Sequence, residues 1–350
     1  MKNKKRFIDS HIHLYSWYNE KGIDLFEGLD NFQKGCVANA INICSLSQGE
    51  YGDVSNNIMC ALYKLHNPTA FAYGGLVYPS YPVRLPLPTD LNFATQYQEL
   101  MEIGFDGIKL LETKPTTLQK LGVAINNECY DEFFKQAEKD GTHFIWHVAD
   151  PEFFWAKEKN YDNDCYYGNG GYSSFDEIFS WVYEVLERYP KLNVTFAHFF
   201  FLADKPSKLE ELFEKYENLS IDITPGTEMY EVFNANHSFY REFFEKYADR
   251  IIFGTDCGFP AIDYNALLTE SVYNVITTDG LVDNIWQVKA KGLRLSDEAS
   301  DKILYTNFAE KHEKPKEINK KALKQYIRKY FHLIQNETER NEIEKAMKNL

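Results

Sequence analysis

The sequence lacks any long uninterrupted hydrophobic run. No stretch of about 18 apolar residues occurs in its 350 residues, so we expect no helix that crosses a membrane. The first six residues are basic, but Asp9, His11 and His13 interrupt the hydrophobic stretch that follows, and we therefore expect no signal peptide. A segment rich in Gly and Ser is also absent, so nothing in the composition marks a linker between domains.

Cysteine is scarce and scattered. The six cysteines stand at positions 36, 44, 60, 129, 165 and 257, and no two of them form a CxxC motif. This spacing excludes a zinc ribbon and a thioredoxin-like motif. Separate thiols in a chain of this length are typical of the reducing cytoplasm, which is the predicted location.

Positive charge is in deficit. The chain carries 38 Lys and Arg against 52 Asp and Glu, which gives a net charge of −14 at pH 7. A surface of this sign repels phosphate backbones, so nucleic acid is a poor partner and a small-molecule substrate is expected. The 26 Phe and 24 Tyr predict a bulky core and pocket lining. The composition does not decide between a monomer and a homo-oligomer.

Short β-rich runs alternate with longer amphipathic stretches. This alternation predicts parallel strands joined by helical crossovers. Eight units of this kind indicate a (β/α)8 TIM barrel over residues 1–312, and an open doubly wound sheet is the alternative. Charged residues with apolar positions at helical spacing predict a helical extension over residues 313–350. The predicted strands are Phe7–His11, Ala40–Leu46, Ala70–Val77, Gly107–Leu111, His143–Val148, Asn193–His198, Leu219–Ile223 and Arg250–Phe253.

The strongest local signal is the pair His11 and His13 at the end of the first predicted strand. Side chains two apart on a strand point to the same side, so the two imidazoles converge as chelation of an ion requires. The carboxyl end of a barrel strand is also where active sites are built. An isolated HxH pair is common by chance, so polar residues at the ends of other strands are needed to support a metal site.

Three further polar residues stand at the ends of other predicted strands. His147 ends the fifth strand, His198 ends the sixth, and Asp256 follows the eighth. Each of them alone is more simply explained as a hydrogen-bonded core histidine or a turn-capping aspartate. Together with the first pair they form a ring of imidazole and carboxylate, which needs an ion or a proton network to offset its burial.

The segments that hold these residues also carry a family resemblance. They are DSHIH at 9–13, GFDGIKL at 104–110, FIWH at 144–147, VTFAH at 194–198 and IIFGTD at 251–256, with a closing helix near 295–308. Together they resemble the amidohydrolase superfamily, in particular its amidohydrolase-related branch of metal-dependent hydrolases and decarboxylases. The resemblance implies that His11, His13, His147 and Asp256 bind an ion, and that Asp256 also accepts a proton from water. It implies for His198 either a second ion or a contact that polarises substrate or water.

Lys109, on the fourth predicted strand, is open to three interpretations. The resemblance implies a carboxylated lysine that bridges two ions in two-ion members of the superfamily. With a single ion, which we expect, Lys109 instead pairs with a substrate carboxylate or is a buried structural amine. Glu112, at the end of the same strand, is an alternative ligand. Mixed nitrogen and oxygen ligation predicts Zn²⁺, and Mn²⁺ or Fe²⁺ also fit.

Loops at the same barrel mouth hold candidates for the substrate pocket. The long segments Leu14–Leu29 and Val77–Thr89 follow the first and third strands and lie on the expected catalytic face. Asp150, directly after the fifth strand, is a candidate to orient the ring of His147. The predicted substrate-binding residues are Lys109, Arg84, Glu228, Tyr15 and Trp17, and Tyr78 and Trp155 are weaker candidates.

Two reactions compete as the predicted function. The first is hydrolysis of a C–N or ester-type bond in a small molecule, with Asp256 and His198 as catalytic residues. The alternative is non-oxidative decarboxylation of a small aromatic or unsaturated carboxylic acid, which an inward-pointing Arg84 or Lys109 would favour. A TatD-type nuclease fits less well because the chain is acidic. A barrel that only binds metal is the remaining alternative.

Overall fold

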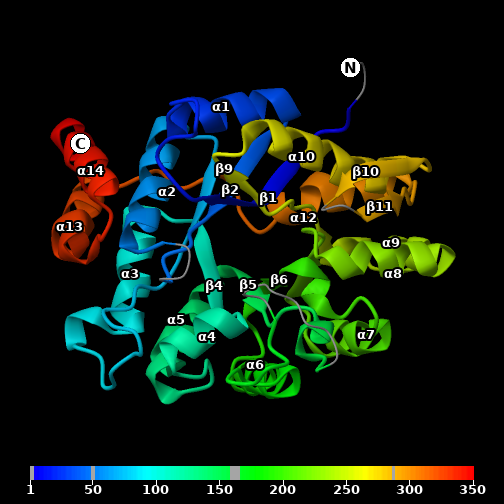
Figure 1. Ribbon diagram of the computed structural model, residues 1–350, viewed down its shortest axis with the longest axis horizontal. Helices are drawn as coiled ribbons and strands as arrows, with labels where there is room; N and C mark the ends of the chain where they lie inside the picture. Colours follow the sequence, from blue (N-terminus) through cyan, green and yellow to red (C-terminus); the bar gives the residue numbers. More distant parts are fainter. Residues whose placement is uncertain (1–3, 49–51, 158–165, 286–287) are drawn as a thin grey trace.

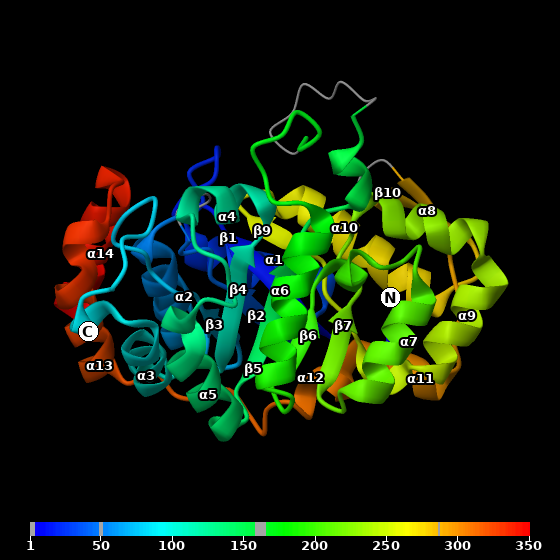
Figure 2. The ribbon, with the colours of Figure 1, turned by 90° about the horizontal axis from the view of Figure 1, so that it is seen from below.

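The computed structural model describes residues 4–48, 52–157, 166–285 and 288–350, so Cys165 lies outside the described residues. Within these ranges nine parallel strands form one sheet, in the order β8-β7-β6-β5-β4-β3-β2-β1-β9. Each strand from β1 to β7 neighbours its successor in the chain, and helices cover the outside (Figure 1 and Figure 2). The strands are β1 (Ile8–Leu14), β2 (Ala40–Cys44), β3 (Phe71–Gly74), β4 (Gly107–Thr113), β5 (His143–Val148), β6 (Asn193–Phe196), β7 (Leu219–Asp222), β8 (Ile251–Ile252) and β9 (Cys257–Phe259).

The eighth strand closes the barrel and is split in two. Its first half, β8, pairs with β7, and its second half, β9, pairs with β1. Between them the Ser10 amide donates to the Phe253 carbonyl over 3.2 Å, and the Asp256 amide donates to the His11 carbonyl over 2.9 Å. Asp256 has φ of +56°, a left-handed conformation that no extended strand continues through. The (β/α)8 TIM barrel is therefore confirmed, and the open-sheet alternative is wrong.

The helices between the strands are amphipathic, and several of them begin at capping residues. Ser174 caps α6 (Phe175–Arg188) through a reciprocal capping box with Glu177, and Asn92 caps α3 (Phe93–Ile103). Among the described residues, no helix is both long enough and apolar enough to cross a membrane. The remaining barrel helices are α1 (Leu25–Cys36), α2 (Val54–His66), α4 (Pro115–Leu121), α5 (Asp131–Asp140), α7 (Pro206–Lys215), α8 (Thr227–Ala235), α9 (His237–Lys246), α10 (Ile262–Thr277), α11 (Asp297–Asp301) and α12 (Asn307–Ala309). A hairpin of β10 (Leu281–Ile285) and β11 (Val288–Lys291) follows α10.

The C-terminal segment forms two helices outside the barrel. Helix α13 (Lys320–Tyr330) lies against α3 and α2, and α14 (Glu337–Asn349) lies against α2 (Figure 1). Buried hydrogen bonds join the layers: Asn57 donates to the Tyr326 hydroxyl over 2.8 Å, and the Tyr330 hydroxyl donates to Glu99 over 2.8 Å. The predicted helical extension therefore exists and is tied to one side of the barrel.

Polar side chains fill the amino-terminal end of the barrel, opposite the predicted site. The Tyr73 hydroxyl lies 2.5 Å from His143 Nδ1 and 2.5 Å from His312 Nε2, and His143 Nε2 lies 2.8 Å from the Thr195 hydroxyl. Burial lowers the pKa of both histidines, to about 3 for His312, so both rings are neutral near pH 7. This cluster carries stability, since the amino-terminal face of such barrels holds no active site.

A buried ion pair ties the C-terminal segment to the sheet. Lys64 Nζ lies 2.5 Å from Asp106 Oδ2, and both side chains are 1% exposed. The same carboxylate accepts the Ala72 amide over 2.9 Å and the Lys316 amide over 2.8 Å. Removal of either charged partner would leave the other charge buried without compensation.

Candidate active site

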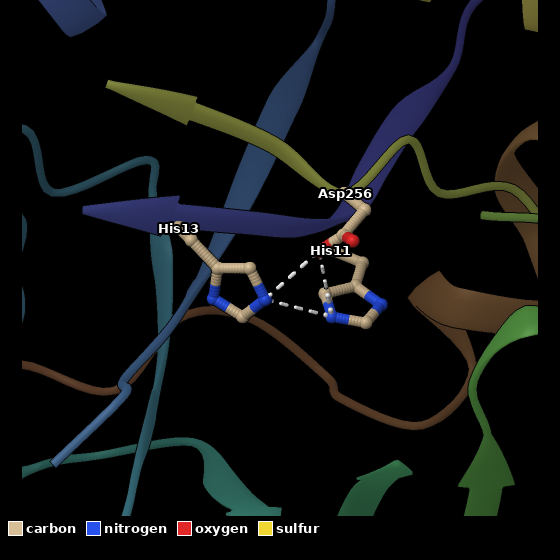
Figure 3. Close-up of side chains that lie close together, drawn as sticks. All are labelled: His11, His13 and Asp256. Carbon is tan, nitrogen blue, oxygen red and sulfur yellow. Dashed lines mark hydrogen bonds and ion pairs between the residues drawn. The ribbon is translucent and has the colours of Figure 1, made fainter. Parts of the chain in front are cut away.

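His11 and His13 converge at the mouth of the barrel, as the HxH spacing predicts. Both side chains leave β1 on the inner side, where their Nε2 atoms lie 3.1 Å apart. Asp256, in the break of the split strand, places Oδ1 3.0 Å from His13 Nε2 and 3.7 Å from His11 Nε2. Figure 3 shows the three side chains pointing toward one another.

Asp256 is ionised and open to solvent. Burial raises its pKa, but the contact with His13 and the nearby His11 and His198 outweigh that effect, so its pKa lies well below the ordinary value. Its side chain is 21% exposed, whereas those of His11 and His13 are 0% and 5% exposed. A carboxylate in this state can bind a cation and accept a proton.

His147 and His198 form a second pair beside the first. His147 is the last but one residue of β5, and His198 begins a short turn that follows β6 after one residue. His198 Nε2 lies 3.1 Å from His147 Nδ1, and the His198 and His11 rings are 5.9 Å apart at their centres. Burial lowers the pKa of both His147 and His198, to about 4 for His198. The structure therefore brings all five predicted residues to one barrel mouth.

The outward nitrogens of the first pair face hydrogen-bond acceptors. His11 Nδ1 lies 2.9 Å from Asp222 Oδ2, and His13 Nδ1 lies 2.7 Å from the Cys44 carbonyl. A carbonyl or carboxylate oxygen can only accept, so each neutral ring carries its proton on Nδ1. The Nε2 lone pairs of both rings are consequently left on the inner side, toward Asp256.

Three acceptor atoms thus meet at one point: His11 Nε2, His13 Nε2 and Asp256 Oδ1. Acceptors 3.0 to 3.7 Å apart repel one another unless a cation or extra protons lie between them. A triangle with these sides has a point about 2 Å from each corner, the length of a bond from zinc to nitrogen or oxygen. In the part of the chain that the structure describes, this trio is also the group of His, Cys, Asp and Glu residues arranged to hold a metal ion. These residues fit a divalent cation.

Lys109 lies inside the site. It projects from β4 with 1% exposure, and its Nζ is 2.7 Å from His11 Nε2. Burial lowers the pKa of this amine. Among the described residues no carboxylate lies within ion-pair distance of Lys109, in contrast to Lys114, which pairs with Asp150 over 2.9 Å. Glu112 is occupied elsewhere, because it accepts hydrogen bonds from Tyr78 and Gln48.

A cavity of about 330 Å³ opens over these residues. Its lining combines charged and polar groups, among them three histidines, Asp256 and two lysines, with apolar side chains. The lining residues are His13, Tyr15, Leu46, Lys109, Leu111, Lys114, His147, Asp150, Pro151, Phe154, His198, Phe201, Pro225, Gly226 and Asp256. The space suits a small molecule that has an apolar body and an anionic end.

Only some of the predicted substrate-binding residues line the cavity. Lys109 and Tyr15 line the cavity. Arg84 is exposed on the loop after β3 and does not line the cavity. Trp17 is 5% exposed and packs edge-on against Phe26, so it does not line the cavity either.

Glu228 stands next to this cavity rather than in its wall. The side chain lies against Gly226, which does line the cavity. Both of its oxygens are buried and have no hydrogen-bond partner among the residues that the structure describes, and burial raises its pKa to about 7.

The residues that contact the outer sides of the histidine rings could be predicted only in part from the sequence. Asp150 lies 3.3 Å from His147 Nε2, which agrees with its predicted orienting position, and Lys114 pairs with the same carboxylate. The contact of Asp222 with His11 was not predicted, although its place at the end of β7 was a usable signal. The Cys44 carbonyl that holds His13 carries no side-chain signal at all.

A closed (β/α)8 barrel with imidazoles and a carboxylate converging at its carboxyl-terminal mouth defines the class of metal-dependent barrel enzymes. A family comparison narrows the class. The amidohydrolase family model matches residues 79–310, and the chain belongs to this family. Members of the family are metal-dependent enzymes that act on small molecules, hydrolases and decarboxylases among them.

Solved structures of other proteins share the fold of this chain. No curated protein matches the chain. Among solved structures, 2,6-dihydroxybenzoate decarboxylase from Rhizobium is 15% identical with a TM-score of 0.53, over 88% of this chain and 98% of that one. A probable 2-pyrone-4,6-dicarboxylic acid hydrolase from Acinetobacter baumannii, with citric acid bound, is 11% identical with a TM-score of 0.52, over 87% and 98%. A dihydroxybenzoic acid decarboxylase from Polaromonas sp. with bound manganese is 13% identical with a TM-score of 0.51, over 88% and 97%.

Proposed function

We propose that this protein is a metal-dependent enzyme that removes the carboxyl group of a small aromatic or unsaturated carboxylic acid as CO₂. The observation that carries the proposal is the inward position of Lys109, because an amine in the cavity can pair with a substrate carboxylate near the ion. Arg84, the other predicted partner of a carboxylate, lies outside the cavity. The proposal therefore depends on Lys109 alone for recognition of the carboxylate.

The surroundings of Lys109 support an anionic substrate. Its amine is buried, faces the cavity and has no ion-pair partner among the described residues. A buried cation without a partner is costly, and a substrate carboxylate would compensate it. The apolar lining residues Leu46, Phe154 and Phe201 suit an unsaturated ring or chain.

A divalent ion would be held by His11, His13 and Asp256, and Zn²⁺ is our first candidate, with Mn²⁺ and Fe²⁺ compatible with the same donors. When bound, such an ion supplies positive charge that polarises a bound oxygen. We propose one ion rather than two, because an unmodified lysine amine can only donate hydrogen bonds here and cannot bridge two cations as a carboxylated lysine would. His147 and His198 are then left to contact the substrate.

The residues of the chain would share the work of the reaction. In decarboxylation the bond from the ring or vinyl carbon to the carboxyl carbon breaks, and its electron pair stays on the substrate carbon. That carbon takes up one proton, and Asp256, the most exposed of the three cation-binding side chains, is placed to relay it. Glu228, beside the cavity, is our candidate to accept a hydrogen bond from a substrate hydroxyl or amine after a change of rotamer.

Hydrolysis is the second candidate function, and the state of Asp256 favours it. An ionised carboxylate that faces the cavity can take a proton from water as that water attacks a carbonyl carbon. His198 would then polarise the carbonyl oxygen. The same residues serve both reactions, so the products must decide between them.

The test is a product analysis with metal-loaded protein. Panels of aromatic and unsaturated carboxylic acids, and of their lactones, esters and amides, are incubated with the enzyme, and CO₂ release and hydrolysis products are measured. CO₂ release that Lys109→Met abolishes, while metal content is retained, supports the proposal. Hydrolysis without CO₂ would replace it by the second candidate, and metal binding without any turnover would indicate a binding protein.

A further inference from the structure

Asp222 contacts both pairs of histidines at the barrel mouth. This residue ends β7, and its side chain is fully buried. One carboxylate oxygen, Oδ2, lies 2.9 Å from His11 Nδ1. The other, Oδ1, accepts the His198 amide over 2.8 Å and the Thr224 hydroxyl over 2.5 Å. The Asp222 carboxylate therefore contacts the ring of His11 and the backbone amide of His198.

The hydrogen bonds of Asp222 determine which nitrogen of His11 carries the proton. The carboxylate oxygen Oδ2 accepts, so His11 donates through Nδ1 and keeps the lone pair of Nε2 on the inner side. That lone pair is one corner of the cation-binding trio. If the proton moved to Nε2, the trio would lose this ligand.

Thr224 connects the Asp222 carboxylate to the ring of His198. The Thr224 hydroxyl has a single proton, which it donates to Asp222 Oδ1. Its oxygen is then free to accept from His198 Nδ1, which lies 3.1 Å away. His198 consequently presents the lone pair of Nε2 toward His147 and the cavity.

We propose that Asp222 is a positioning residue that sets the proton positions of His11 directly and of His198 through Thr224. In this way a single buried carboxylate keeps a nitrogen of each ring free for a cation or for substrate. The inference rests on the proposed function only in taking the barrel mouth as a cation site.

Asp222→Asn tests the direct contact, because an amide cannot replace both oxygens. The two backbone amides at Oδ1, from His198 and Thr224, can only donate, so the Asn carbonyl oxygen must face them. The Asn NH₂ group then faces His11 Nδ1, which must accept, and the ring proton moves to Nε2. We expect 10- to 100-fold weaker Zn²⁺ binding by calorimetry, as loss of outer hydrogen-bond partners commonly causes.

Ring spectra of protein with ¹⁵N-labelled histidine report the proton position without any metal. In metal-free wild type we expect an Nδ1-protonated pattern for His11, and in Asp222→Asn an Nε2-protonated one. Asp9→Asn is the matched control: Asp9 is equally buried, but it bonds the Thr255 hydroxyl over 2.7 Å and the His11 backbone, and no ring. This control should keep the wild-type pattern and affinity.

Thr224→Val and Thr224→Ser form a second pair that does not alter the carboxylate. Valine removes the acceptor of His198 Nδ1, so we expect the His198 pattern to change, whereas serine should restore it. Unchanged ring patterns in both Asp222→Asn and Thr224→Val would overturn the inference. Wild-type protein that binds neither Zn²⁺ nor Mn²⁺ would instead sink the proposed function, since ring patterns are read without metal.

Discussion

The histidine cluster at the amino-terminal end of the barrel predicts a specific loss of stability in acid. His312, which contacts the Tyr73 hydroxyl, has a pKa of about 3 in the folded protein, because burial disfavours the charged ring. An unfolded histidine titrates near 6.5. The unfolded state therefore binds more protons below pH 6.5, and the contribution of His312 to stability is lost from about pH 6.5 down to about pH 3.

The size of this effect follows from the two pKa values. At pH 7 the unfolded His312 is mostly neutral, and at pH 5 it is almost fully protonated while the folded ring stays neutral. Linkage then lowers the free energy of unfolding by about 2 kcal/mol between these two pH values. Asp9 acts in the opposite direction, because burial raises its pKa to about 7 and its protonation stabilises the folded state in acid. The total pH dependence is thus a sum of opposed effects, and only a comparison with a variant isolates His312.

The assay is urea unfolding of wild type and His312→Gln at pH 7 and pH 5. Glutamine retains a group that can bond the Tyr73 hydroxyl but does not titrate, so the variant should lose about 2 kcal/mol less than wild type between the two pH values. His332→Gln, at an exposed position, controls for the loss of a histidine. Equal losses in wild type and His312→Gln would show that His312 is not held neutral in the fold.

Three further predictions concern the site and the buried ion pair. His11→Ala should remove bound metal while the barrel stays folded, because the side chain lies at the mouth; metal content and circular dichroism check this, and normal metal content would contradict the assignment. Asp256→Asn should keep the fold and most of the metal but lower turnover by roughly 10²- to 10⁴-fold, since an amide cannot carry the proton; retained turnover excludes Asp256 as the proton carrier. Lys64→Met should cost about 3–5 kcal/mol in urea unfolding, because it leaves Asp106 charged and buried, and a cost below 1 kcal/mol would show that the pair is dispensable.

The convergence of His11, His13, His147, His198 and Asp256 was predictable from the sequence. Each residue ends a β-rich run, and the carboxyl ends of parallel strands meet at one face of a barrel. The alternation of strands and helices therefore predicts that side chains from distant points of the chain meet at one barrel mouth.

The positions of the loop residues could not be predicted in the same way. Arg84 and Trp17 follow barrel strands as Tyr15 does, yet only Tyr15 lines the cavity. Loop residues have no repeating period, so their direction depends on local packing and turns rather than on a pattern. The split of the eighth strand was missed for a related reason, because the left-handed conformation of Asp256 is imposed by closure against β1.

By itself the sequence determined the eight strand–helix units, the barrel class and the residues at the strand ends, since alternation of strand and helix leaves a recognisable period. Only the tertiary structure decided that Lys109 lies 2.7 Å from His11, that Asp222 holds the outer nitrogen of that ring, and that Arg84 lies outside the cavity. The two contacts join residues that are about 100 and about 200 positions apart in the chain. No local pattern encodes such a distance, because it depends on how the whole barrel closes.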